Sequence, residues 1–167
     1  MQEHPELLRL VLERDGFLLE LHPTKVLDNH LVQRVASATA TQLGASAARS
    51  DTAHLELVRG GLLYALDALE TAHSIFQENP SHLGSYWHGM LHRREGDFDN
   101  ARYWFRRAGT PPCFHEESPM GKRWDPSQLT HLFEERPTGK ALEDARQLQR
   151  AEFEALLTHC LQMTRNS

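Results

Sequence analysis

The residues best suited to chemistry lie between positions 73 and 95. His88, His92 and Glu95 are spaced i, i+4 and i+7, which places their side chains within about 60° of one another around a helix. Two imidazoles four residues apart on a helix can bind one metal ion, and a carboxylate can join them. Gly89 stands where the HExxH metalloprotease motif has its glutamate. The spacing therefore predicts a helical metal or ligand site without that protease chemistry.

The preceding helical segment offers a third imidazole. His73 lies in a stripe of apolar residues with i+3 and i+4 spacing, so we expect it to be buried, where it needs a hydrogen-bond partner or a metal ion. The turn at Pro80 and Ser81 should make the two segments antiparallel neighbours. The sequence thus predicts a metal site of three imidazoles and a carboxylate, for which zinc, nickel and iron are all suitable. Its predicted ligands are His73, His88, His92 and Glu95.

Other polar residues are predicted to line the same pocket. Arg93 and Arg102 could bind the anionic group of a small ligand, although pairing with neighbouring acids would explain them equally well. Gln149 and Glu152 interrupt the apolar face of the last predicted helix and are expected to point inward. The full set of predicted ligand-binding residues is His73, His88, His92, Arg93, Glu95, Arg102, Gln149 and Glu152.

Two alternatives to a metal site stay open. The stripe that carries His88 and His92 lies about 130° from the centre of the apolar face of its own helix, so it would be solvated unless another segment covers it. The histidines and Glu95 could also form a hydrogen-bonded cluster or a ligand pocket without metal. The irregular segment 113–123 is long for a passive connection and is a candidate binding loop.

Composition limits the function classes. The chain has 167 residues, 40% hydrophobic and 25% charged, which fits one globular domain over 1–167. A net charge of -5 disfavours nucleic-acid binding. No apolar run approaches the roughly 20 residues of a membrane span, and the N-terminus does not resemble a signal peptide. Cys113 and Cys160 lack CxxC spacing. We expect a cytoplasmic protein with free thiols.

Helical periodicity runs through almost the whole chain, and strand-like alternation is absent. The pattern predicts an all-α bundle of about seven helices without a sheet. These helices are expected at about 5–12, 24–44, 51–79, 81–96, 97–109, 125–133 and 140–164, with the third at the centre. Thr24 and Asp97 are the expected N-caps of the second and fifth helices, and Pro80-Ser81 and Asp125-Pro126 are expected to begin the fourth and sixth.

Part of the chain resembles a single tetratricopeptide-like hairpin. Between Ser81 and Pro112, Gly89, the run Gly96-Asp97-Phe98 and the later Ala101, Phe105 and Ala108 follow the pattern of that repeat. Ser85 and His92 stand where the repeat has aromatic residues, and no second copy follows. The resemblance implies a helical hairpin rather than a repeat array.

A longer resemblance is to an uncharacterised family of small bacterial all-helical proteins. It rests on AHSI at 72–75, YWHGMLHRREGDFDNARYWFRRAG at 86–109, WDP at 124–126 and LQRAEFEALL at 148–157. The resemblance implies a helical fold over most of residues 70–160 and no particular reaction.

Two functions follow from these patterns. The first is a metal- or small-ligand-binding helical protein, which could be an enzyme, with its pocket centred on residues 73–95. The second is a tetratricopeptide-like interaction module whose histidines are structural. Burial and convergence of His73, His88 and His92 distinguish the two.

Overall fold

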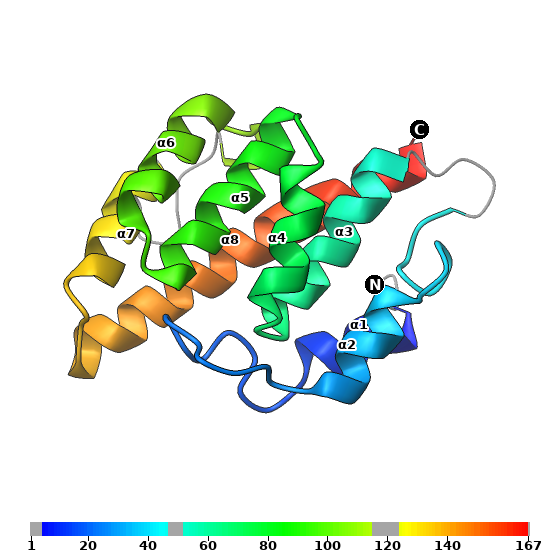
Figure 1. The fold of residues 1–167 in the computed structure, drawn as a ribbon, viewed down its shortest axis with the longest axis horizontal. Helices are drawn as coiled ribbons and strands as arrows, with labels where there is room; N and C mark the ends of the chain where they lie inside the picture. Colours follow the sequence, from blue (N-terminus) through cyan, green and yellow to red (C-terminus); the bar gives the residue numbers. More distant parts are fainter. Residues whose placement is uncertain (1–4, 47–51, 115–123, 167) are drawn as a thin grey trace.

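The chain folds into a bundle of α-helices (Figure 1). A computed structural model describes residues 5–46, 52–114 and 124–166, and within these ranges it contains eight α-helices, one short 3-10 helix and no strand. This confirms the predicted all-α class. The helices are α1 (Glu6–Leu12), α2 (Asn29–Ala36), α3 (Thr52–Ala65), α4 (Leu69–Gln77), α5 (His82–Glu95), α6 (Phe98–Ala108), α7 (Pro126–Glu134) and α8 (Gly139–Asn166), with η1 (Pro112–Phe114) after α6.

Helix α5 is the most enclosed element. Eleven consecutive residues, from Gly84 to Arg94, are buried, because α4, α6, α3 and α7 all pack against it. The long helix α8 crosses behind α3, α4 and α5 in Figure 1 and contacts α3 and α7. Aromatic rings fill the core between these helices: Trp87 stacks on Phe76 with ring centroids 5.4 Å apart and meets Phe153 edge-on at 5.7 Å.

The helix predicted over 51–79 is instead two helices, α3 and α4, which accounts for the eighth helix. Asp67 between them has a φ of 59°, a left-handed backbone that ends a helix. Groups from distant segments stabilise the break: Arg94 donates to the Tyr64 carbonyl at 2.9 Å and pairs with the Asp67 carboxylate at 2.6 Å. His73, which the sequence predicted to be buried in the core, is half-buried in α4, although Phe76 of the same stripe is buried.

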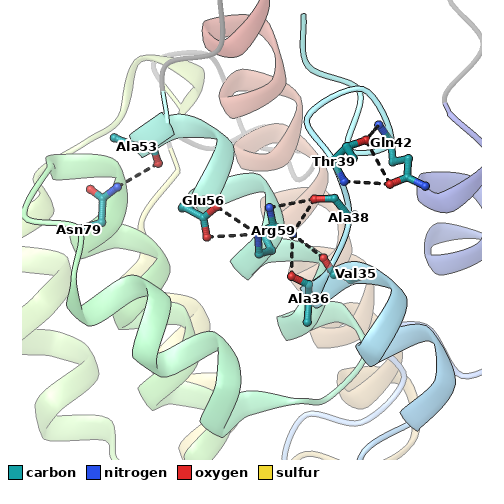
Figure 2. Close-up of polar contacts among 9 residues, drawn as sticks. All are labelled: Val35, Ala36, Ala38, Thr39, Gln42, Ala53, Glu56, Arg59 and Asn79. Atoms are coloured by element: carbon teal, nitrogen blue, oxygen red, sulfur yellow. Dashed lines mark hydrogen bonds and ion pairs between the residues drawn. The ribbon is translucent and has the colours of Figure 1, made fainter. Parts of the chain in front are cut away.

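Helix α2 also differs from the prediction. It begins at Asn29, because the Asp28 side chain, rather than Thr24, accepts a hydrogen bond from the Leu31 amide at 2.9 Å. It ends at Ala36, where an arginine from α3 covers the last carbonyls. Figure 2 shows Arg59 donating to the carbonyl oxygen of Val35 at 2.7 Å and to those of Ala36 and Ala38 at 3.1 Å.

The ends of α5 and α6 agree with the prediction. Ser81 caps α5 by accepting from the Gly84 amide at 3.0 Å, and Gly96 ends it with a φ of 81°. Asp97 caps α6 by accepting from the Asn100 amide at 3.3 Å. Between the two helices, a Cβ at Gly89 would lie 2.8 Å from the Phe105 ring, so glycine permits their close approach.

In the described ranges, no helix combines the length and the apolar character that a membrane crossing requires. Of the candidate loop at 113–123, Cys113 and Phe114 lie in η1, and residues 115–123 are outside the described part of the chain.

Candidate metal centre

Three histidines from two neighbouring helices converge on one point. His73 comes from α4, and His88 and His92 come from successive turns of α5. Each ring offers one nitrogen such that the three nitrogens lie within 4.8 Å of one another. The His88 and His92 rings are stacked with centroids 4.7 Å apart, and the His73 ring meets them edge-on at 4.7 and 5.1 Å. The structure thus brings together the three imidazoles that the sequence predicted.

Helix α6 covers the cluster from the other side. The Trp104 ring stacks on His88 with centroids 4.1 Å apart and an interplanar angle of 22°. His88 is only 3% exposed and His92 only 6%. The alternative in which this stripe faces solvent is therefore wrong for both histidines. Gly89 contributes to this cover, because the close packing that it allows holds Phe105, and with it the adjacent Trp104, against α5.

His88 has no hydrogen-bond partner for either ring nitrogen among the described residues. Burial, with additional effects of His92 and His73, lowers its pKa from 6.5 to about 4. The imidazole is therefore neutral at physiological pH and keeps a free nitrogen lone pair. A buried polar group without a partner is uncommon in folded proteins and destabilising by about 1–3 kcal/mol.

His92 has a polar neighbour at each ring nitrogen. The Glu95 carboxylate lies 3.0 Å from Nδ1, and the Asn100 side-chain nitrogen lies 3.2 Å from Nε2. Glu95 is outside the group of converging ligand atoms and sits beside His92 instead. Asn100 was not among the predicted site residues. The turn between α5 and α6 places Asn100 beside the end of α5. The predicted hairpin could therefore have indicated that Asn100 lies near His92.

Arg93 and Glu152 form a separate buried network. The two side chains are fully buried and pair with each other. The Tyr86 hydroxyl donates to Glu152 at 2.8 Å, and the Trp124 indole N–H donates to that hydroxyl at 2.7 Å. Arg93 follows His92 by one residue and so projects from α5 in a direction about 100° away. This pair therefore belongs to the packing of α5 against α8 rather than to the histidine cluster.

Gln149 and Arg102 also have partners elsewhere. Gln149 donates to the carbonyl oxygen of Leu18 at 3.0 Å. Arg102 pairs with Glu134 on α7 and with Asp99 in its own helix. Of the eight predicted site residues, the structure brings together His73, His88 and His92. The predicted fourth metal ligand, Glu95, instead lies against His92, and Arg93, Arg102, Gln149 and Glu152 make contacts of their own.

The histidine group stands out on geometry alone. In the described residues it is the one group of three or more His, Cys, Asp or Glu side chains whose arrangement could hold a metal ion. Comparison with protein-family models, with curated proteins and with solved structures found no match. Any functional argument therefore starts from these side chains.

Proposed function

We propose that this protein binds a divalent transition metal ion through His73, His88 and His92. The observation that carries the proposal is His88: a buried imidazole whose two nitrogens both lack a partner, within a group of three nitrogens that converge to within 4.8 Å. A metal ion would supply the partner that the surrounding residues do not.

The donor set indicates which ions would bind. Three neutral imidazoles without a thiolate suit zinc, nickel or iron(II). Three protein ligands leave at least one coordination position for water or a small ligand, which is the arrangement of catalytic rather than structural zinc sites. Binding of a small anion would take place at that position on the metal, since Arg93 and Arg102 are paired with carboxylates.

The proposal is tested by titrating chelator-treated, tag-free protein with Zn²⁺ and Ni²⁺ in a calorimeter. We expect one ion per chain, and binding that is lost in His88→Asn and weakened at least tenfold in His73→Asn. His73 is half-buried, so its variant should keep the fold if the more buried His88 variant does not. His131→Asn is the matched control, because that histidine is exposed on α7 and lies far along the chain from the cluster.

Trp104 offers an independent signal. Its ring stacks on His88, so Ni²⁺ in the site should quench its fluorescence, and Trp104→Phe should abolish most of that quenching while retaining the calorimetric binding. Equal metal binding by wild type and folded His73→Asn would overturn the site. In that case the histidines would be structural, as in the interaction-module alternative.

A further inference from the structure

The contacts of His92 indicate which of its ring nitrogens carries the proton. The Glu95 carboxylate lies 3.0 Å from Nδ1, and a carboxylate can only accept. The ring N–H is not aligned with the carboxylate as in a full hydrogen bond. The Glu95 side chain is about one-third exposed. This contact favours the proton on Nδ1.

The contact at the other ring nitrogen, Nε2, also favours a proton on Nδ1. The side-chain nitrogen of Asn100 lies 3.2 Å from His92 Nε2 and 3.4 Å from the Asp97 carboxylate. Because the carboxylate accepts, the amide must turn its NH₂ group toward Asp97, and the same NH₂ group faces His92. The Nε2 atom therefore accepts and carries no proton.

We propose that Glu95 and Asn100 are positioning residues that hold His92 in the Nδ1–H tautomer, so that a metal ion binds the Nε2 lone pair by displacing the Asn100 amide from it. This inference rests on the proposed metal site. A carboxylate at the far nitrogen of a metal-binding histidine fixes the ring and raises its basicity. It would also place a negative charge beside a dication whose three ligands are neutral. The role explains why Glu95 lies next to the histidine cluster and not within it.

The tautomer can be measured without any metal. Long-range ¹H–¹⁵N NMR of the ¹⁵N-labelled, metal-free protein at pH 7.5 should show His92 protonated at Nδ1 and bare at Nε2. In Asn100→Asp carboxylates would face both nitrogens, so we expect a proton on Nε2 in addition to the one on Nδ1. Asp99→Asn is the matched control, because Asp99 is fully exposed in the same turn and pairs with Arg102. A wild-type His92 protonated at Nε2, or an unchanged tautomer in Asn100→Asp, would overturn the inference.

Metal affinity provides the second readout. Zinc binding should weaken about 10- to 100-fold in Glu95→Ala, less in Glu95→Gln, whose amide oxygen can still accept from Nδ1, and not at all in Asp99→Asn. If wild type binds zinc and Glu95→Ala binds it equally well, the positioning role fails while the metal site stands. If wild type binds no zinc, the proposed function fails, and the tautomer measurement still decides whether Glu95 and Asn100 orient His92.

Discussion

At the scale of single residues, some buried ionisable groups of the protein are paired with an opposite charge, and His88 is not. Arg93 and Glu152 are both fully buried and compensate each other, with Tyr86 as a further partner of the carboxylate. His88 is buried without such compensation, so burial keeps it neutral by lowering its pKa. The first arrangement pairs two opposite charges inside a packed interface, whereas the second leaves two ring nitrogens without a partner.

The low pKa of His88 predicts a pH dependence for the metal-free protein. His88 takes up its proton near pH 6.5 in the unfolded chain but only near pH 4 in the folded one. Between these values the unfolded state binds more protons, so the free energy of unfolding falls as the pH is lowered, and above about pH 6.5 His88 adds no dependence. Urea denaturation at pH 7.5, 6.0 and 4.5 measures this loss.

The comparison that isolates His88 is with His88→Asn, which should lose less stability than wild type over the same pH range. His131→Asn should behave like wild type, since that side chain is 66% exposed. Parallel pH profiles for wild type and His88→Asn would show that His88 titrates normally in the folded protein.

At the scale of helices, arginine side chains from other elements bond the carbonyl oxygens at the ends of α3 and α2. Arg94 of α5 donates to the Tyr64 carbonyl near the end of α3 and to the Glu20 carbonyl at 2.8 Å. In the same way, Arg59 of α3 donates hydrogen bonds to the carbonyl oxygens of Val35 and Ala38 at the end of α2 (Figure 2). A guanidinium has five N–H donors in a fixed plane, so it can satisfy several carbonyl groups that a helix end leaves unpaired.

Removal of Arg59 should destabilise the protein. Its guanidinium is largely buried and bonds three carbonyl oxygens at the end of α2, so Arg59→Ala should lower the free energy of unfolding by about 2 kcal/mol. The control is Arg34→Ala, because Arg34 is 40% exposed and pairs loosely with Glu6 at 3.7 Å, a contact worth about 0–1 kcal/mol. Chemical denaturation gives both values, and equal losses would contradict a capping role for Arg59.

At the scale of the whole molecule, the C-terminal helix α8 is hydrogen-bonded to a segment near the N-terminus. Three residues on one face of α8 donate hydrogen bonds to three consecutive carbonyl oxygens in the segment between α1 and α2. Gln149 bonds Leu18 at 3.0 Å, and the flanking contacts are Arg146 to Leu19 at 2.9 Å and Arg150 to Phe17 at 3.1 Å. Leu18 has a φ of 47°, an unusual backbone for a leucine that these bonds help to maintain.

Gln149→Leu should therefore weaken the whole fold. It leaves the Leu18 carbonyl without its buried partner, so we expect a loss of about 1–3 kcal/mol. Unfolding should remain a single transition, with circular dichroism and tryptophan fluorescence coincident, because α8 contacts α3 as well as the N-terminal segment. Gln162→Leu, an exposed change on the same helix, is the control. Separate transitions for the two probes would argue against this coupling.

The sequence alone determined the helical class, most helix ends and the histidine cluster. Ser81, Gly96, Asp97 and Asp125 act through backbone groups within three residues of themselves, so local patterns predict them. The spacing of His88 and His92, together with the turn before α5, was enough to predict that His73 would join them.

Only the tertiary structure decided the break between α3 and α4, the covering of His88 by Trp104, and the partners of Gln149 and Arg93. Periodicity gives the direction in which a side chain leaves its helix, but a buried polar group is stabilised by whichever donor or acceptor meets it from another element. Those partners lie as far as 131 positions away in the chain, as Leu18 does from Gln149. For the same reason, only the folded chain shows that His88 has no partner.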